Sequence, residues 1–466
     1  MKVLLVAHGY PPELVGGTEN TVRALAHGLA AAGLEPVVVA GSLHHEQGFR
    51  RSLELDQGAP GKPIRVHRIH RADLFFDHWQ KSGSARVSRA FGELLREERP
   101  DVVHVHHWIR LTRDLVHRAA LEGVPAVVTL HDLWTSCLVI FRVRPQDGEF
   151  CQARLAPSPC IACAAQVPPS TPWISYESQG VALLERTADL VRELELARAV
   201  VAPTFAHAVA LARFLGIPAA RLALEVLPLG RDLALAPRPR AHLPPPGEKL
   251  VLGAWGHLFR LKGADRILRA LARLPDPARV ELRLAGGEPD EAYARELRQL
   301  ARGLDVKFLG PYDVAELGTN PVSDVHAFVS GTLAHESWGL VLDEAVALGL
   351  PLVLPRSGSY AERLIEGQGA LFYEPGSDAE LAALFARLVD EPDLVERLRA
   401  RLPESRRFTP TMADYVRRHL ALYERAVAAG PPAARAVPER ERIWQATEDA
   451  WGRELQKRTG EELGLA

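Results

Sequence analysis

Glu336 and Glu344 are the two acidic residues whose setting in this sequence most favours chemistry. The apolar run DVHAFV at 324–329 predicts a strand, and SGTLAHESWG after it predicts a loop that contains Glu336. The next segment, LVLDEAVALG, is apolar at helical spacing and places Glu344 in a helix that ends at Gly349. In open α/β sheets ligands bind outside the carboxyl ends of the strands, where a helix N-terminus offers N–H groups to an anion. Two glutamates at this spacing occur by chance about once or twice in such a chain, so the surrounding elements carry the prediction.

The length and composition favour a two-domain enzyme. A chain of 466 residues exceeds what one hydrophobic core usually supports. The net charge of −2 argues against a general attraction to nucleic acid or to acidic membranes. No uncharged apolar run approaches the length of a spanning helix, and the first strand passes directly into a loop. We therefore expect a cytoplasmic protein without a signal peptide.

The first half of the chain is typical of a doubly wound sheet. KVLLVA at 2–7 predicts a buried strand, and the loop after it contains Gly16 and Gly17 before a helix that ends at Gly33. Further strands are predicted at 36–40, 64–69, 102–105 and 126–130, with helices at 85–98 and 111–122. The glycine loop lacks the GxGxxG spacing of a dinucleotide site. Its glycines either let backbone N–H groups approach a phosphate or sugar, or only form a turn.

Histidines follow two of these strands. The first group, HVHHW, contains His104, His106 and His107, and the second, TLHDLW, contains His131. A single histidine is more often a structural residue than a catalyst. His131 is the better candidate because it lies beside Asp132 at the end of a buried strand, where an imidazole can accept or orient a substrate hydroxyl.

All four cysteines lie between residues 137 and 163, with the spacing C-x13-C-x8-C-x2-C. They are Cys137, Cys151, Cys160 and Cys163. In a reducing compartment this clustering favours thiolate ligation over disulfides. Zinc fits four sulfur ligands best, an iron–sulfur cluster is second, and unligated or disulfide-bonded cysteines are the remaining alternative. A closed four-cysteine site leaves no open coordination position, so such a metal would be structural.

The second half repeats the α/β pattern after a linker. Residues 231–249 are rich in proline and lack periodicity, and a new strand is predicted at 250–254. The loop that follows, WGHLFRLKGAD, brings His257, Arg260 and Lys262 together with two glycines. A strand-to-helix turn of this kind can bind phosphate, and a solvated basic loop is the alternative. Further strands and helices follow, and the chain ends in helical segments.

Several segments, in this order, resemble those of retaining glycosyltransferases of the two-Rossmann-domain type, specifically the large family 4. They are PPELVGGTENTVRALAHGLAAAG, TLHD, APT, LPLG, GHLFRLKG, LRLAGG, FLGPY and the block SDVHAFVSGTLAHESWGLVLDEAVALGLPLVLPRSG. The last block is the most specific, because it joins the E-x7-E glutamate pair to an S-W-G turn and a G-x-P strand entry. The cysteine segment is similar to an insertion carried by a subset of this family.

The resemblance implies the GT-B fold, in which two Rossmann-like doubly wound α/β domains face a cleft and a C-terminal helix crosses back to the first domain. The implied N-terminal acceptor domain spans 1–235, with the cysteine-rich insertion at about 137–165. The nucleotide-sugar donor domain spans 247–408, the crossover helix 409–430 and a C-terminal extension 431–466.

The resemblance also implies roles for single residues. Glu336 would face the donor sugar's hydroxyls near the reaction centre, and Glu344 would hold the nucleotide ribose. His131 would lie near the transferred sugar. Gly16 and Gly17 would lie against the donor phosphate or the acceptor.

The expected diphosphate site departs from the family pattern at one position. Gly339 and Leu340 would offer backbone N–H groups, and Lys262 would balance the charge of the diphosphate. The family usually has arginine directly after the glycine of its G-R-L turn, and here that residue is His257. Arg260 in the same loop would supply the missing cation, or the diphosphate would bind more weakly.

The function implied by the resemblance is a retaining transfer of a hexosyl group, as in polysaccharide biosynthesis. The donor would be a UDP- or GDP-sugar, and the acceptor a glycan or a lipid-linked molecule. No catalytic metal is expected, because cationic side chains and a helix N-terminus would stabilise the leaving phosphate. A nucleotide-sugar epimerase of the same fold and a catalytically silent scaffold or metal-binding partner protein are the alternatives.

The C-terminal extension contains a helical segment, ERIWQATEDAWGRELQKR, with Trp444 and Trp451 seven residues apart on one face. An additional packing helix is the first interpretation. A contact with a partner, or with the inner face of the membrane, is the second.

Overall fold

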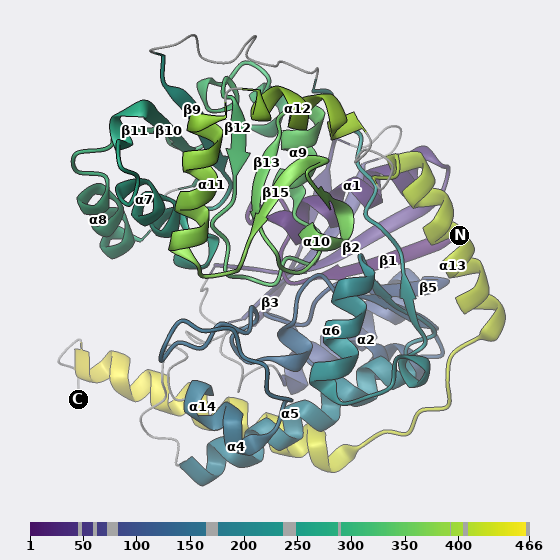
Figure 1. Cartoon of the computed structure of the whole chain (residues 1–466). Helices are drawn as coiled ribbons and strands as arrows, with labels where there is room; N and C mark the ends of the chain where they lie inside the picture. The colour runs from purple at the N-terminus through teal and green to yellow at the C-terminus, as the bar shows by residue number, and fades with distance from the viewer. Residues whose placement is uncertain are drawn as a thin grey trace. The chain divides into compact units, whose positions relative to one another are not determined.

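The computed structural model describes residues 1–44, 49–58, 63–71, 83–164, 176–235, 248–287, 290–391, 393–403 and 409–462. The chain forms two compact units (Figure 1). The first unit consists of Met1–Pro203, Ala208–Gly230 and Thr411–Ala466, and the second of Thr204–His207 and Arg231–Pro410.

The first unit is built on an eight-stranded sheet with the order β3-β4-β2-β1-β5-β6-β7-β8. Its strands are β1 Lys2–Ala7, β2 Glu35–Gly41, β3 Arg50–Asp56, β4 Ile64–His70, β5 Val102–Val105, β6 Ala126–Thr129, β7 Val200–Ala202 and β8 Leu224–Val226. All pairs are parallel except β3 with β4. The central strands are runs of valine, leucine and alanine because helices cover both faces of a parallel sheet.

Strand β1 pairs with β2 on one side and with β5 on the other, so the sheet is built outward from β1 in two opposite directions. Such a switch point opens a crevice at the carboxyl ends of the strands. Helix α1 (Gly17–Ala31) begins directly after the loop that follows β1. The other helices in this half of the chain are α2 Ala85–Glu98, α3 Leu115–Leu121, α4 Pro157–Ala164, α5 Tyr176–Leu196 and α6 Phe205–Leu215, of which Phe205–His207 group with the second unit.

Helix α13 (Met412–Ala429) returns to the first unit (Figure 1). It packs so closely on α1 that a Cβ atom at Gly28 would lie 2.6 Å from Val416. The Tyr423 hydroxyl also lies 2.7 Å from Nδ1 of the fully buried His104 in β5. The helix that crosses back to the first domain is therefore present as expected.

The second unit has a seven-stranded parallel sheet with the order β11-β10-β9-β12-β13-β15-β14. Its strands are β9 Leu250–Trp255, β10 Val280–Ala285, β11 Asp305–Phe308, β12 Ala327–Val329, β13 Leu352–Pro355, β14 Ile365–Glu366 and β15 Gly369–Tyr373. Its helices are α7 Ala264–Ala272, α8 Glu291–Leu300, α9 Leu340–Ala347, α10 Tyr360–Arg363, α11 Asp378–Asp390 and α12 Leu394–Arg401. The predicted α/β class with two Rossmann-like domains is confirmed.

Strand β3 is the main element that the sequence does not predict. None of the seven residues of its segment, RRSLELD, is buried, and the segment lacks the apolar run that identifies the other strands. It is the antiparallel edge strand beside β4, where one face needs no apolar cover.

The C-terminal helix α14 (Pro438–Glu462) packs on the first unit through its N-terminal half. Trp444 is buried, and a Cβ atom at Gly83 would lie 2.6 Å from its ring. Arg118 donates to Glu441 at 2.6 Å, which ties α14 to α3. These contacts agree with a packing helix, and the side chain of Trp451 lies outside the described residues. Among the residues that the structure describes, no helix has the length and apolarity to cross a membrane.

Candidate active site

The second unit brings Glu336 and Lys262 together from two loops. Glu336 lies in the loop between β12 and α9, and Lys262 lies in the turn between β9 and α7. The Lys262 Nζ and Glu336 Oε1 atoms are 2.5 Å apart, and the Thr332 hydroxyl lies 3.1 Å from the same oxygen. The carboxylate is 13% exposed and the lysine side chain 32%, so both remain accessible to a ligand.

The two loops are held by close backbone contacts. A Cβ atom on Gly263 would lie 1.9 Å from the carbonyl oxygen of Gly331, and one on Gly331 would lie 2.1 Å from that of Gly263. A Cβ on Gly358 would lie 2.3 Å from the carbonyl oxygen of Glu336, which also accepts the N–H of Ser359 at 2.8 Å. These positions exclude any larger residue. The geometry of the Lys262–Glu336 pair is therefore set by the backbone, which favours a preorganised site.

Helix α9 begins beside this pair. Its N-cap is Gly339, which has φ +81°, and a Cβ there would lie 2.4 Å from the Tyr360 ring. The first N–H groups of a helix have no partner within the helix, and the helix dipole is positive at this end. Leu340 is the first residue of α9, so the predicted anion-binding N–H groups lie at a helix N-terminus.

Glu344 is buried and already partnered. Arg231 donates to its Oε1 at 2.8 Å, and the Trp255 indole donates to its Oε2 at 3.0 Å. Burial raises the pKa of Glu344, and the Arg231 guanidinium opposes that shift. Arg231 also donates to the carbonyl of Leu340 at 2.8 Å. The Tyr312 hydroxyl also donates to Oε2 at 3.4 Å, so the remaining capacity of Glu344 for a hydroxyl is at Oε1.

The structure does not bring Arg260 to this pair. Arg260 is instead 57% exposed and its guanidinium binds Glu296 of α8, which also accepts from Arg269 at 3.1 Å. The predicted substitute for the missing family arginine is thus engaged by an acidic residue of a neighbouring helix. His257 lies in the same loop, 6.5 Å between ring centroids from Phe259. Lys262 is the cation that contacts Glu336.

His131 follows β6 in the first unit and is partnered by another histidine. Its Nε2 lies 2.9 Å from Nδ1 of His106, which follows β5. Burial lowers the pKa of His131 to about 4, although the nearby Asp132 carboxylate opposes the shift. Burial also holds the pKa of His106 well below its usual value. Both rings are therefore neutral at pH 7, and a neutral imidazole can donate one hydrogen bond and accept another.

Asp132 is held by His107. Nδ1 of His107 accepts the N–H groups of Trp108 and Ile109 at 3.0 and 3.1 Å, so its proton is on Nε2, which donates to Asp132 at 3.2 Å. Burial raises the pKa of Asp132, but the hydrogen bonds from His107 and from the Trp134 backbone N–H outweigh it and lower that pKa to about 2. Asp132 is therefore a fixed negative charge beside His131.

Gly16 and Gly17 lie at the start of α1, and Gly16 is its N-cap. A Cβ on Gly16 would lie 2.5 Å from Oε2 of Glu19, because the Glu19 side chain folds back over this turn. Glu19 binds His8 at 2.8 Å. Burial opposes ionisation of Glu19, but the hydrogen bond of His8 lowers its pKa to about 2. Gly16 thus makes room for the hydrogen-bonded His8–Glu19 pair at the carboxyl end of β1.

Comparisons with known proteins identify the family. The model of Glycosyltransferase Family 4 matches residues 15–235, and that of Glycosyl transferases group 1 matches residues 237–404. The chain belongs to glycosyltransferase family 4.

Named relatives agree with this membership. The glycosyltransferase is 27% identical over 425 residues to a glycogen synthase of Mycobacterium tuberculosis, covering 87% of this chain and 90% of the relative. It is 30% identical over 344 residues to D-inositol 3-phosphate glycosyltransferase 1 of Catenulispora acidiphila, covering 71% and 73%. Its fold matches an α,α-trehalose-phosphate synthase (UDP-forming) from Burkholderia xenovorans in complex with glucose-6-phosphate. That match has a TM-score of 0.60, 15% identity and coverage of 91% and 100%. The GT-B fold is thereby confirmed.

The four cysteines of this glycosyltransferase are all free thiols. Cys160 and Cys163 lie on α4, and Arg142 donates to the sulfur of Cys151 at 3.6 Å. Burial raises the pKa of Cys137 to about 11, and the Arg142 charge opposes the shift. In the part of the chain that the structure describes, no group of three or more His, Cys, Asp or Glu side chains is arranged to hold a metal ion. Zinc at these cysteines stays a prediction, and metal analysis of the purified protein tests it.

Sequence reasoning missed His8, Glu19 and Arg231 of this glycosyltransferase. His8 follows directly after β1, so a search for polar residues at the carboxyl ends of buried strands would have found it. Arg231 offers no such signal, because its partner Glu344 is more than a hundred residues away.

Proposed function

We propose that this enzyme is a retaining, metal-independent glycosyltransferase that uses a UDP- or GDP-sugar and transfers the sugar to a glycan or a lipid-linked acceptor. The observation that carries the proposal is the Lys262–Glu336 pair, 2.5 Å apart, beside the N-terminus of α9. A cation and a helix N-terminus bind a diphosphate, and a carboxylate binds sugar hydroxyls.

The leaving diphosphate would be stabilised by Lys262 and by the N–H groups at Gly339 and Leu340. As the bond between the sugar and the phosphate breaks, negative charge develops on the phosphate oxygen. Fixed positive groups at that point lower the barrier without having to reorganise during the reaction. They supply the charge that a divalent ion would otherwise provide.

Retention would follow from attack on the face that the diphosphate leaves. The bond between C1 and the phosphate oxygen breaks, and the bond between C1 and the acceptor oxygen forms. The acceptor's proton goes to a phosphate oxygen of the leaving nucleoside diphosphate. Once Lys262 binds the phosphate, Glu336 is released to accept hydrogen bonds from the sugar.

His131 would bind a hydroxyl of the transferred sugar, and Glu344 would bind the ribose. The low pKa of His131, about 4, keeps its ring neutral, so it can act as donor or acceptor without adding charge. The relatives support the donor class, since one matched fold is UDP-forming. The matched glycogen synthase and inositol phosphate glycosyltransferase support transfer to carbohydrate-like acceptors.

Calorimetry with a panel of UDP-, GDP- and ADP-sugars tests the donor class. Heat with a UDP- or GDP-sugar supports the proposal, heat with ADP-sugars alone contradicts the donor class, and no heat with any of them contradicts the proposal as a whole. Glu336→Gln should then reduce transfer at least a hundredfold while the donor still binds. Glu291→Gln, at a side chain that is 93% exposed on α8, is the control. Unchanged turnover in Glu336→Gln would contradict the role of Glu336. A product that is only an interconverted nucleotide sugar would contradict glycosyl transfer.

A further inference from the structure

Strands β3 and β4 present a row of polar side chains on one face. The register pairs Arg50 with His70, Ser52 with Arg68 and Glu54 with Val66. Side chains alternate between the two faces of a strand, so Arg50, Ser52 and Glu54 point to the same side. They are the side chains of β3 that face away from Leu53, which is 57% exposed on the other face.

This face forms part of a pocket of about 530 Å³. Its lining residues are Pro12, Glu13, His44, Arg50, Ser52, Glu54, Arg68 and His70. His70 ends β4, His44 follows β2, and Glu13 follows β1. The pocket therefore lies at the carboxyl ends of the parallel strands, which is the ligand-binding edge of such a sheet.

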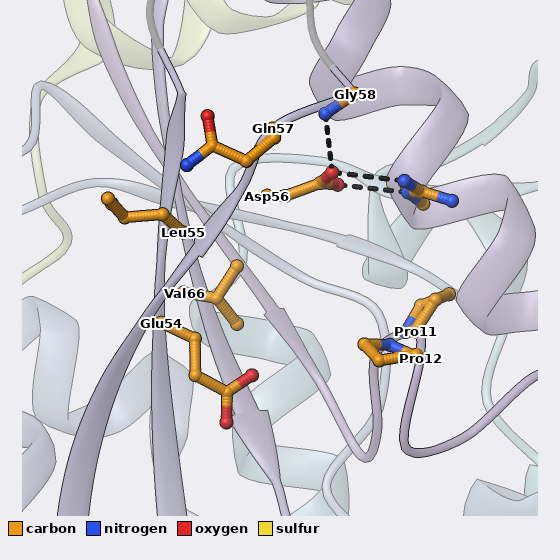
Figure 2. A pocket seen from close by; sticks show the side chains of 9 residues that line it. Pro11, Pro12, Glu54, Leu55, Asp56, Gln57, Gly58 and Val66 are labelled. Carbon is orange, nitrogen blue, oxygen red and sulfur yellow. Dashed lines mark hydrogen bonds and ion pairs between the residues drawn. The ribbon is translucent and has the colours of Figure 1, made fainter.

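A second pocket of about 270 Å³ adjoins the first, because both are lined by Pro12 and Glu54. Figure 2 shows Pro11 and Pro12 on one side of this second pocket and the β3 residues Glu54, Leu55 and Asp56 on the other. We refer to the two pockets together as the β3 trough.

The walls of the β3 trough are fixed by partly buried hydrogen bonds. Arg68 is 1% exposed and donates to both Glu54 oxygens at 2.8 and 2.7 Å, and it lies 3.3 Å from Glu13. Ser52 Oγ lies 2.9 Å from Nε2 of His70. The polar groups are thus held in place before a ligand arrives, which reduces the entropic cost of binding.

The end of the second pocket is anchored by Asp56. Its carboxylate accepts from Arg23 at 2.9 and 3.0 Å and from the Gly58 N–H at 3.0 Å (Figure 2). It also accepts from the Tyr10 hydroxyl at 2.9 Å and lies 2.8 Å from Nε2 of His27. Burial opposes its ionisation, but these hydrogen bonds, first that of Arg23, hold the pKa of Asp56 well below its usual value. Asp56 is therefore a structural anchor that closes the pocket.

The lining of the β3 trough fits an uncharged carbohydrate. Glu13 and Glu54 balance the charges of Arg50 and Arg68 in the lining, and both glutamates pair with Arg68, so the lining has no surplus of positive charge for a phosphate-rich ligand. Carboxylate, hydroxyl and imidazole groups match sugar hydroxyls, which both donate and accept. Pro11 and Pro12 add small apolar surfaces of the kind that pack on the C–H face of a sugar ring. A lipid chain would instead cover these charged side chains and remove them from water.

We propose that the β3 trough binds the acceptor as an oligosaccharide, with one sugar unit in each of its two pockets. This inference rests on the proposed glycosyltransferase function, since it names the acceptor of that reaction. An acceptor that fills both pockets binds more tightly than a single sugar, because each pocket adds its own contacts.

The test combines oligosaccharide binding with two catalytic readouts. An array of neutral mono- to tetrasaccharides identifies the best-bound probe, and that probe is used for transfer assays beside acceptor-free hydrolysis of the nucleotide sugar. We expect a trisaccharide to be used at least tenfold more efficiently than a monosaccharide. In Glu54→Gln and in Arg50→Ala, the ratio of transfer to donor hydrolysis should fall at least tenfold.

Leu53→Gln is the matched control, because it lies on the opposite face of the same strand and should behave as the wild type. Thermal unfolding checks that each variant folds, and the exposed Arg50 provides a variant that leaves the buried Arg68 network intact. Equal use of mono- and trisaccharides, or an unchanged ratio in both folded variants, overturns the inference. Transfer to a lipid-linked acceptor that neither variant affects also overturns it. Oligosaccharide binding that these variants weaken, in a protein that neither hydrolyses nor transfers any nucleotide sugar, supports the trough and contradicts only the proposed function.

Discussion

The second unit fixes its acidic and basic pair through the backbone, whereas the first unit fixes its polar residues through other side chains. Around Lys262 and Glu336, glycines bring loops to within contact of each other's carbonyl groups. Around His131, the contacts are between histidines and carboxylates, such as His106 with His131 and His8 with Glu19. Backbone contacts tolerate no added atom, while side-chain contacts can be weakened one at a time. Substitutions in the two units should therefore have different effects on stability and activity.

Gly263→Ala should produce the largest effect. The new Cβ would lie 1.9 Å from the Gly331 carbonyl oxygen, at a residue with φ +71°. Left-handed backbone costs a non-glycine residue about 1–2 kcal/mol, and the clash adds about 1–3 kcal/mol. We expect urea unfolding to show a loss of about 3–4 kcal/mol, together with loss of transfer activity.

Gly303→Ala is the matched control for this substitution. Gly303 has φ +80°, and nothing lies within 4 Å of its Cβ position. Gly303→Ala should lower the free energy of unfolding only by the cost of left-handed backbone, about 1–2 kcal/mol. Equal losses of unfolding free energy in Gly263→Ala and Gly303→Ala would show that the contact between the loops does not stabilise the second unit. That result would contradict the proposed difference between the two units.

Lys262→Met should reduce the rate of transfer about a hundred- to a thousandfold, because it removes one charged group that stabilises the leaving phosphate. Stability should change little, since the lysine side chain is 32% exposed. Single-turnover kinetics measures the rate. Arg260→Met serves as the comparison, because Arg260 binds Glu296 and should lose little activity. A larger loss of transfer rate in Arg260→Met than in Lys262→Met would show that Arg260, as the sequence predicts, stabilises the leaving phosphate.

His106→Leu should reduce kcat about tenfold, because His131 loses the ring that orients it. A positioning role predicts partial rescue by His106→Asn, whose amide can restore one hydrogen bond to His131. A purely structural role would lower the unfolding temperature of both variants without separating their kcat values. Steady-state kinetics beside thermal unfolding distinguishes the two.

Glu19→Gln should have the smallest effect on transfer activity, and its effect on stability should depend on pH. The folded pKa of Glu19, about 2, lies below the ordinary value of 4.5, so its ionised form stabilises the folded protein above about pH 5. That contribution is lost as the pH falls toward 2. The difference in unfolding free energy between the wild type and Glu19→Gln should therefore shrink between pH 6 and pH 3. A constant difference across this range would show that the His8–Glu19 pair does not stabilise the first unit.

The order of strands and helices could be predicted because each buried parallel strand is a short apolar run and each helix has an apolar period. Gly349, for example, has φ +75° where the sequence predicts the end of a helix. The edge strand β3 could not be predicted, because an exposed antiparallel strand needs neither signal. As a result, the polar face that forms the β3 trough is visible only in the structure.

The sequence by itself determined the family, the two-domain α/β class, and the loops that carry Glu336, Lys262 and His131, because these follow from local patterns in the chain. Only the tertiary structure decided which side chains meet. In the folded protein Lys262 pairs with Glu336, which is 74 residues away in the sequence, Arg260 pairs with Glu296, and Arg231 pairs with Glu344. Such pairings depend on distances between loops that are remote in sequence, and no local propensity encodes those distances.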